Sequence, residues 1–389
     1  MYLTRKEEKI YDGEFGWAYQ TAMKILVRLG DLFGASKLIP IKSAHISGVS
    51  YKTLGDAPID FLKATAETCP RVRVPSTLNP CGFDSDYLVT KFPEKLRKKQ
   101  ALILNLYTQI GVVPALTCTP YYLKTPKNGW HLASAESSAV VYTNSVLGAW
   151  TNREGSPSAL AAALVGKVPD YGVHRPENRQ PSIVVKVETE LANEAEFGAL
   201  GVCVGKMLKD EVPVFQGLPA NVKGDELKQL GAGLASSGMI SIFHYKPSPT
   251  KGLERVAVTK SDVRNAMENL SANVGTPDLV FVGCPHCSLG EVKAVADLVR
   301  DKKVRREFWV CTSRFVKEKA MEHVRVIEKA GGHVLCDTCA IVTWLKELGV
   351  KVMLTNSAKA AYYSPTMNRV DAVLAPLNEC VETALKLQR

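Results

Sequence analysis

The second half of the chain alternates between short apolar runs and longer segments whose apolar residues recur at helical spacing. Continuous apolar runs, typical of strands buried on both faces, occupy residues 278–283, 307–312, 333–335, 350–355 and 371–375. Helical patterns follow at residues 289–300 and 315–330 and again at the end of the chain. This alternation predicts a parallel sheet with right-handed crossover connections.

The first half has a less regular pattern. Apolar positions at helical spacing predict a helix within residues 14–32, and a second helix is expected at 158–164. Loops rich in glycine, serine and proline lie at 43–55 and 75–86, and such loops are where functional sites tend to lie. The segment 212–218, with its prolines and glycine, suggests a boundary between the halves. We therefore expect an N-terminal α/β region at 1–215 and a C-terminal parallel α/β domain at 216–389.

Composition narrows the class of protein. The chain of 389 residues is too long for one ordinary core, and its 46% hydrophobic and 23% charged residues are globular values. No apolar stretch approaches the roughly 20 residues of a membrane span, and no signal-peptide pattern opens the chain, so we expect a cytoplasmic protein without a membrane partner. The net charge of +10 favours an anionic partner such as a phosphorylated small molecule. Because the basic residues are scattered and no recognition motif accompanies them, nucleic acid is not expected.

Ten cysteines in a cytoplasmic chain do not suggest disulfides, because cellular thiols keep them reduced. Cys69, Cys203 and Cys380 are expected to be small buried apolar groups. Ligands of parallel sheets bind beyond the carboxyl ends of the strands. Cys284 follows the first predicted strand, Cys311 ends the second, and Cys339 lies just past the third. The segment 356–359 follows the fourth. One sheet edge should therefore gather two or three thiols, an amide and an amine.

Two C-x-x-C pairs, Cys284 to Cys287 and Cys336 to Cys339, leave several kinds of site open. Four thiolates could bind zinc, but two predicted helices and a strand separate the pairs instead of the roughly 15–20 residues of a zinc ribbon. A redox dithiol, an iron–sulfur site and a purely structural role are the alternatives. A lone cysteine such as Cys118 is more often a core residue than a ligand. His286 and His333 are expected to be ordinary histidines with satisfied hydrogen bonds.

Long segments of the chain resemble the aconitase X family. The most specific are AESSAVVYTNSVLGA at 135–149 and TNREGSPSALAAAL at 151–164. Shorter matching segments lie, in order, at residues 43–50, 74–80, 117–121, 283–286 and 337–340. The resemblance covers nearly the whole chain. It implies an aconitase-like, multi-domain α/β/α architecture for the large part of a dehydratase whose site also needs a smaller swivelling domain.

The resemblance also implies a partner and a cofactor. This chain stops at Arg389 after the last strand–helix unit, so a separate small subunit is expected to supply the swivelling domain. The family's ligands for a [4Fe-4S] cluster fall on Cys118, Cys284 and Cys339, with Cys287 and Cys336 beside them, although the cluster type stays open. Three ligands on four irons leave one iron open as a Lewis acid. The family's substrate-binding positions fall on Gly48, Val49, Ser50, Asn79, Pro80, Ser137, Ser138 and Lys359.

The activity implied by the resemblance is dehydration of a small hydroxy acid. In the split, archaeal form of the family the substrate is mevalonate 5-phosphate, which gives trans-anhydromevalonate 5-phosphate in a variant mevalonate pathway. Bacterial relatives act instead on cis-3-hydroxy-L-proline. No residue of this chain is an evident catalytic base; in the wider aconitase group a serine of the swivelling domain has that role. A zinc-stabilised binding subunit without chemistry of its own is the alternative from a different class.

Overall fold

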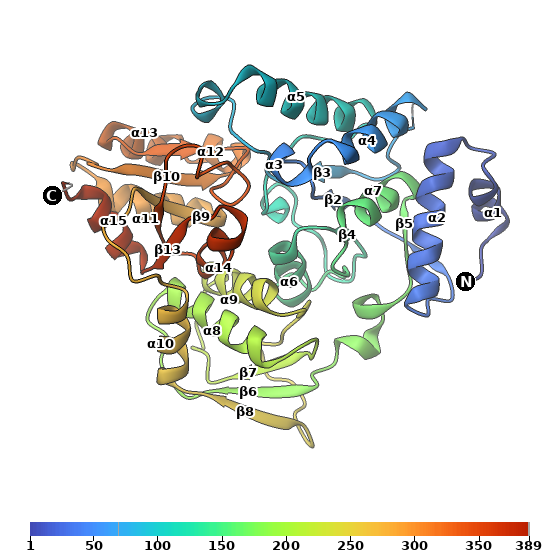
Figure 1. The fold of residues 1–389 in the computed structure, drawn as a ribbon. Coiled ribbons are helices and arrows are strands. Elements are labelled where there is room, and N and C mark those ends of the chain that lie inside the picture. The colour runs from blue at the N-terminus through green and yellow to red at the C-terminus, as the bar shows by residue number, and fades with distance from the viewer. Residues whose placement is uncertain (69, 388–389) are drawn as a thin grey trace.

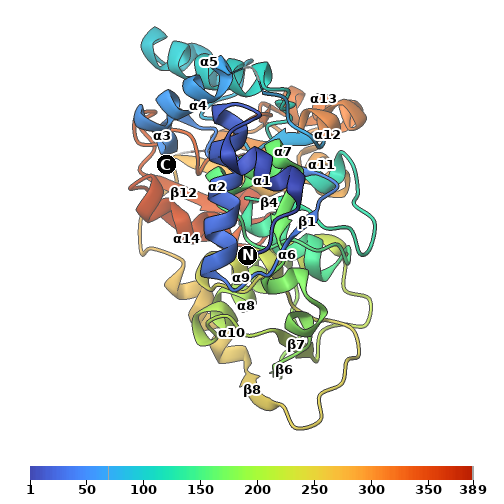
Figure 2. The same cartoon turned by 90° about the vertical axis from the view of Figure 1, so that its right-hand side faces the viewer.

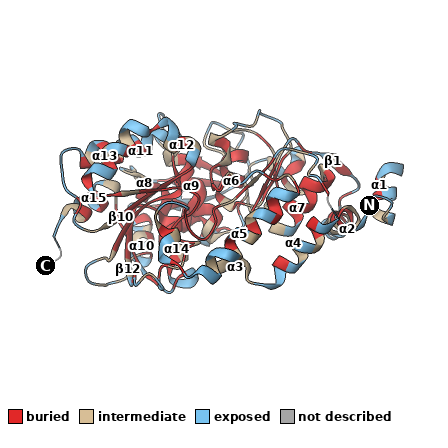
Figure 3. Ribbon diagram, turned by 90° about the horizontal axis from the view of Figure 1, so that it is seen from above, coloured by how far each residue is buried: buried red, intermediate tan, exposed pale blue. Residues whose placement is uncertain are grey.

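The computed structural model describes residues 1–68 and 70–387, and Figure 1 shows its three regions. Cys69, expected to be buried, lies outside the described residues. No helix of the described segments is long and apolar enough to cross a membrane. Figure 3 shows that buried residues concentrate in the helices at the centre of the molecule, such as α8 (Glu194–Met207) and α9 (Gly224–Ser237).

The C-terminal region is built on a five-stranded parallel sheet, as the sequence predicts. Its strand order is β11-β10-β9-β12-β13. The strands are β9 (Leu279–Cys287), β10 (Glu307–Thr312), β11 (His333–Leu335), β12 (Val352–Thr355) and β13 (Asp371–Leu374). The helices are α11 (Leu289–Val299), α12 (Arg314–Lys319), α13 (Met321–Ala330), α14 (Ala358–Met367) and α15 (Leu377–Leu385). Every residue of β9 is buried, which confirms the expectation of a strand covered on both faces.

Two different cores cover the faces of this sheet. Val280 and Val282 of β9 pack in one core with apolar residues of α11, α13 and α15. Leu279 and Phe281 point to the other side and share a core with α8, α9 and α14. The single helix expected at 315–330 is wrong: the chain forms α12 and α13, which meet at the buried Ala320, where φ is −100° and ψ is 15°.

The middle region contains a three-stranded parallel sheet of order β7-β6-β8. Its elements are β6 (Ile183–Val187), α8, β7 (Pro213–Gln216), α9, β8 (Glu254–Val258) and α10 (Lys260–Asn269). Figures 1 and 2 both place α8 and α9 between this sheet and the rest of the molecule. The two helices cross closely at glycines, since a Cβ on Gly201 would lie 2.3 Å from the Leu230 carbonyl oxygen. Residue 215 lies within β7, and the two-part division at that position stays a prediction.

The N-terminal region combines a three-stranded parallel sheet of order β3-β2-β4 with an antiparallel pair, β1 and β5. The strands are β1 (Leu38–Pro40), β2 (Ala44–Ile46), β3 (Ser76–Leu78), β4 (Ala133–Ser134) and β5 (Lys167–Pro169). The α-helices are α1 (Arg5–Asp12), α2 (Trp17–Leu32), α3 (Tyr51–Leu54), α4 (Ala57–Glu67), α5 (Glu94–Gln109), α6 (Ser137–Ser145) and α7 (Ser156–Val165). Short 3-10 turns are η1 (Leu88–Lys91), η2 (Pro120–Tyr122), η3 (Gly172–His174) and η4 (Pro176–Arg179). Helices α2 and α7 confirm the two helices expected in this half.

Candidate functional site

The carboxyl ends of two parallel sheets meet at a buried ion pair. Glu136 follows β4 and caps the start of α6, where its Oε1 accepts hydrogen bonds from the amide (3.3 Å) and hydroxyl (2.8 Å) of Ser138. Lys359 lies in the first turn of α14, just after β12. Its Nζ bonds Glu136 Oε1 and also donates to Ser138 Oγ at 3.2 Å. Asn79, which follows β3, donates from Nδ2 to Glu136 Oε2 at 2.8 Å.

Both members of this pair are charged at neutral pH. Burial alone would raise the pKa of Glu136, but Lys359 and the hydrogen bonds from Asn79 and Ser138 lower it to about 2. Burial would lower the pKa of the Lys359 ammonium, but the Glu136 carboxylate holds it above the ordinary value. The site therefore contains a fixed cation and a fixed anion, desolvated together.

Three buried thiols lie close enough to Lys359 for its charge to act on them. Cys118 lies in the loop between α5 and η2, Cys284 lies near the end of β9, and Cys339 follows β11. Burial raises the pKa of each of these thiols, to about 12 for Cys284. The Lys359 charge lowers the pKa of all three, and Glu136 raises it. The three cysteines predicted as ligands thus face one ammonium group, although they come from opposite ends of the chain.

A bulge at the end of β9 carries Cys284 toward this space. Val282 pairs with Val310 of β10, and the next pair is Cys287 with Thr312. Residues 283–286 of β9 therefore lie opposite the single residue Cys311 of β10, so they bulge out of the sheet. Gly283 has φ +111°, and a Cβ there would lie 2.2 Å from the Cys311 carbonyl oxygen. The Ser357 hydroxyl donates to the Cys284 carbonyl and fixes the other side of the bulge. Cys284 is therefore part of β9 and does not simply follow it, while Cys311 is buried in the adjoining core.

His286 connects the segments that carry the three thiols. Its backbone amide donates to Cys118 Sγ at 3.1 Å. Its ring Nε2 lies 3.0 Å from the Thr338 carbonyl oxygen, which only accepts, so Nε2 carries the proton and Nδ1 accepts from the Thr117 hydroxyl at 3.0 Å. Burial lowers the pKa of the ring to about 4, so the imidazole is neutral. The expectation of a histidine with satisfied hydrogen bonds is confirmed.

The predicted substrate residues lie in two groups. Asn79, Ser138 and Lys359 meet directly at Glu136, with Pro80 and Ser137 next to them in the chain. The loop of Gly48, Val49 and Ser50 instead packs toward the Cys339 segment. The Ser50 hydroxyl donates to the Val342 carbonyl, three residues after Cys339, at 2.8 Å. On the side of α5, the Val49 carbonyl accepts from Gln100 Nε2 at 2.8 Å.

The two C-x-x-C pairs do not form one zinc site. Within residues 1–68 and 70–387, no group of three or more His, Cys, Asp or Glu side chains is placed to hold a single metal ion, and this holds for Cys118, Cys284 and Cys339 as well as for the two pairs. Burial raises the pKa of Cys336 and Cys287; the charges that act most on Cys336 are those of Lys317 and Asp337, and the charge that acts most on Cys287 is that of Glu291. The four-thiolate arrangement considered from spacing is therefore not assembled in this structure.

Family models match the chain in three consecutive segments. The aconitase X first domain matches residues 1–177, the second domain 181–268 and the third domain 277–386. This chain belongs to the aconitase X family. The crystal structure of Thermococcus kodakaraensis aconitase X in its holo-form is 40% identical, with a TM-score of 0.92, covering 99% of this chain and all of that one. The aconitase-like α/β architecture expected from sequence is thus confirmed.

Curated relatives divide into two groups. The phosphomevalonate dehydratase large subunits of Methanocaldococcus jannaschii and Methanothermobacter thermautotrophicus are 43% and 44% identical. The matches cover 98% and 96% of this chain and 100% and 96% of those proteins. The cis-3-hydroxy-L-proline dehydratase of Pseudomonas aeruginosa is 31% identical over 97% of this chain but only 69% of its own length.

Sequence reasoning missed two residues of this candidate site. Glu136 stands within the segment 135–149 that carries the resemblance, yet only its serine neighbours were singled out. An acidic residue directly before a helix of small and apolar residues is an N-cap signal that could have identified it. His286 lies two residues after Cys284, but its contact with Cys118 joins residues 168 apart in the chain. No local pattern predicts such a contact.

Proposed function

We propose that this chain is the large subunit of a hydro-lyase that converts mevalonate 5-phosphate into trans-anhydromevalonate 5-phosphate. The observation that carries the proposal is the end-to-end match with relatives named phosphomevalonate dehydratase large subunit. The hydroxyproline dehydratases match a shorter share of their own length at lower identity, so their substrate is the second candidate. The word "subunit" in the relatives' names supports a separate small partner chain.

We further propose that Cys118, Cys284 and Cys339 hold an iron–sulfur cluster, of the [4Fe-4S] type. Thiolates are the protein ligands of such clusters, and three on four irons leave one iron open. The structure supports this assignment through its donor set: three buried thiols face one ammonium, and the His286 amide donates to Cys118 Sγ. When bound, the cluster would supply a Lewis acid for the departing hydroxyl group. Because burial keeps the free thiols protonated, binding would release protons to solvent.

Lys359 is the group of this chain best placed to orient an anionic substrate. Its ammonium has three N–H donors, of which Glu136 and Ser138 take two. One donor is left for a carboxylate or phosphate oxygen at the strand ends. Glu136 and Ser138 fix the ammonium before substrate arrives, so little reorganisation is needed on binding. Asn79 completes the arrangement by holding the second oxygen of Glu136.

Glu136 itself is unsuited to remove a proton from carbon. With a pKa of about 2 its carboxylate is a weak base, and a weakly acidic C–H bond needs a base with a pKa nearer the working pH. We therefore assign Glu136 a positioning role. The base is proposed to come from the small subunit, which would make the site complete only in the assembled pair.

The test is an assay of the chain purified anaerobically with its small subunit. Mevalonate 5-phosphate and cis-3-hydroxy-L-proline are supplied separately, and the conjugated alkene acid formed from the former is followed by ultraviolet absorbance. The proposal expects turnover of mevalonate 5-phosphate only. Turnover of hydroxyproline alone would overturn the substrate, and a colourless preparation with stoichiometric zinc would overturn the cluster.

A further inference from the structure

The N-terminal end of α9 contacts two of the three segments that carry the proposed ligands. Helix α9 belongs to the middle region, whereas Cys118, Cys284 and Cys339 come from the regions on either side of it in the chain. Two residues of α9, Asp225 and Lys228, lie one turn apart, and their charged groups are 3.5 Å from each other. The middle region therefore reaches the proposed cluster site through this end of one helix.

Lys228 connects the two segments through its ammonium group. The side chain is only 1% exposed. Its Nζ donates to the His286 carbonyl oxygen at 3.2 Å and lies 5.7 Å from the centre of the Tyr122 ring, a distance typical of a cation–π contact. His286 stands two residues after Cys284. Tyr122 stands four residues after Cys118. One buried cation thus contacts both chain segments.

Asp225 connects the same two segments through its carboxylate. Its Oδ2 accepts a hydrogen bond from the Ser288 hydroxyl at 2.9 Å, and its Oδ1 accepts one from the Tyr122 hydroxyl at 3.3 Å. Ser288 follows β9 directly and caps α11, so it moves with the end of the bulge that presents Cys284. Because each oxygen of one planar group holds a different segment, a shift of either segment away from the other breaks a hydrogen bond.

The burial of Lys228 is not explained by stability alone. Lysine is almost never fully buried unless it is paired, and the partner here is Glu291, whose Oε2 also accepts from the Ser288 amide at 2.7 Å. Burial would lower the pKa of the Lys228 ammonium, but the Glu291 carboxylate holds it well above the ordinary value, so the group stays charged. Replacing a buried ion pair by apolar residues is often neutral or stabilising, so the pair indicates a role beyond packing.

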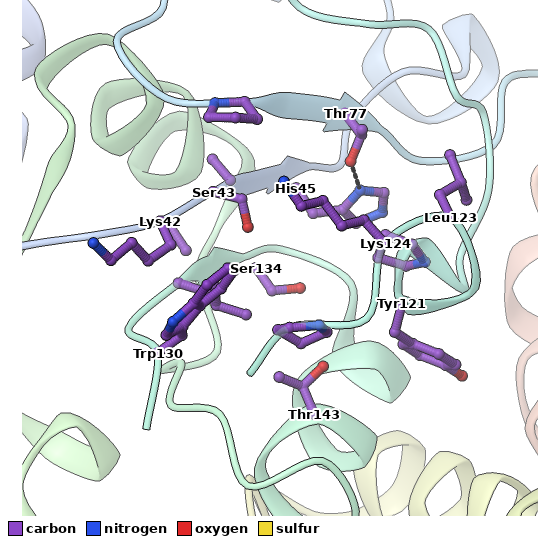
Figure 4. Close-up of a pocket in the computed structure, with 16 residues that line it drawn as sticks. Lys42, Ser43, His45, Thr77, Tyr121, Leu123, Lys124, Trp130, Ser134 and Thr143 are labelled. Atoms are coloured by element: carbon purple, nitrogen blue, oxygen red, sulfur yellow. Dashed lines mark hydrogen bonds between the residues drawn. The ribbon is translucent and has the colours of Figure 1, made fainter. Parts of the chain in front are cut away.

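The segment that carries Cys118 is less well supported on its other side. The turn η2 borders a cavity of about 130 Å³ that residues of β2 and β3 also line. Figure 4 shows Tyr121 and Leu123 at the wall that this turn forms, whereas Tyr122 contacts α9 instead. A chain segment beside a cavity has fewer packing contacts on that side, so the position of this one depends on its contacts with α9 and His286.

We propose that Asp225 and Lys228 are positioning residues that hold Cys118 and Cys284 at the spacing that the proposed cluster requires. This role rests on the proposed iron–sulfur function, to which it adds the middle region. Through His286, whose ring bonds the segment after β11, the same contacts extend to the third ligand segment. Residues that orient metal ligands through hydrogen bonds contribute about 10–100-fold to metal affinity, so a measurable effect on the cluster is expected.

The test compares two lysine–glutamate pairs that are built alike. Lys228→Met/Glu291→Gln removes the pair beside the proposed cluster, where Glu291 is the third residue of the α11 capping box. The matched control is Lys167→Met/Glu7→Gln, because Glu7 has the same place in the capping box of α1 and lies 2.6 Å from Lys167 Nζ. Figures 1 and 3 both place α1 far from β9. Each chain is purified anaerobically with its partner subunit.

The readouts are properties of the cluster itself. In the presence of an iron chelator, Lys228→Met/Glu291→Gln should lose its visible absorbance about tenfold faster than the wild type. The electron paramagnetic resonance spectrum of its reduced cluster should also change. Asp225→Asn, whose amide keeps an acceptor for only one of the two hydroxyl groups, should show smaller changes in the same direction and does not depend on the folding of the double variant. The control should match the wild type in rate and spectrum.

Two kinds of failure can be told apart. If the wild type contains iron but the α9 variants match it in rate and spectrum, the positioning role is overturned while the cluster stands. The role is equally overturned if the control changes as much as the α9 variants, because the effect would then follow from lost stability. A wild type without iron would overturn the proposed cluster, and the role of α9 with it.

Discussion

Lys359 and Glu136 form a buried ion pair between residues 223 apart in the chain. The pair joins α14, at the carboxyl end of the five-stranded sheet, to α6, at the carboxyl end of the N-terminal sheet. Both side chains are about 10% exposed. The Lys359 charge also lowers the pKa of all three thiols, so this one contact joins the two sheets beside the proposed ligands.

Removing one partner of this pair should destabilise the fold. Lys359→Met leaves the Glu136 carboxylate buried without its cation, so we expect the free energy of unfolding to fall by about 3–5 kcal/mol. Urea denaturation followed by circular dichroism measures the loss. In the double variant Lys359→Met/Glu136→Leu no charge is left unpaired, and part of the stability should return.

The control for that experiment is Lys293→Met. Lys293 pairs with Asp297 on the exposed face of α11, where solvent screens the charges, so little change is expected. Equal losses from Lys293→Met and Lys359→Met would show that the buried pair has no special structural role.

The same pair predicts how stability depends on acid. The pKa of Glu136 falls from an ordinary 4.5 to about 2 on folding, so the stability that it contributes is complete above about pH 5. That stability is lost as the pH falls from about 4.5 toward 2, with a steepest slope of about 1.4 kcal/mol per pH unit for one proton. Urea midpoints measured between pH 3 and pH 7 should show a larger acid-induced fall for the wild type than for Glu136→Gln. Identical pH profiles would contradict the lowered pKa.

The bulge that presents Cys284 should not tolerate a side chain at Gly283. Gly283→Ala combines a positive φ with a Cβ only 2.2 Å from the Cys311 carbonyl oxygen, so strain and overlap add. We expect a loss of more than about 2 kcal/mol in unfolding free energy and a lower iron content after anaerobic reconstitution.

Gly252→Ala separates the conformational cost of a positive φ from the cost of steric overlap. Gly252 also has a positive φ (+80°), but a Cβ there would have no neighbour within 4 Å, so only the conformational cost of about 1 kcal/mol is expected. If Gly283→Ala were no more harmful than Gly252→Ala, the close approach to β10 would not constrain the bulge.

Much of the C-terminal region could be predicted from the sequence. Its strands are continuous apolar runs because both faces are covered, and that pattern is local. The break at Ala320 was not predicted, since the apolar spacing continues through it and only the packing of α12 and α13 on the sheet shows the turn. The short strands β2, β3 and β4, of two or three residues each, are too brief for a periodic pattern.

The candidate site was only partly predictable, because some of its contacts join distant segments and leave no local pattern. Strand order brings Cys284, Cys339 and Lys359 to one edge of a sheet, and this is visible in the alternation of elements. The approach of Cys118 and Glu136 depends on how the N-terminal sheet docks against that edge. Such docking is set by side-chain packing between distant segments, so the family resemblance was needed to choose Cys118 and no pattern pointed to its contact with His286.

The iron content of Cys118→Ser, purified anaerobically with the small subunit, tests most directly whether thiols from both ends of the chain hold one cluster. The wild type should contain about four irons per large subunit, with visible absorbance, and should dehydrate mevalonate 5-phosphate. Cys118→Ser should lose the iron, the colour and the turnover, whereas the control Cys336→Ser should retain all three. If Cys118→Ser kept its metal and activity while Cys336→Ser lost them, the three-cysteine site would be wrong and the two C-x-x-C pairs would be the metal ligands.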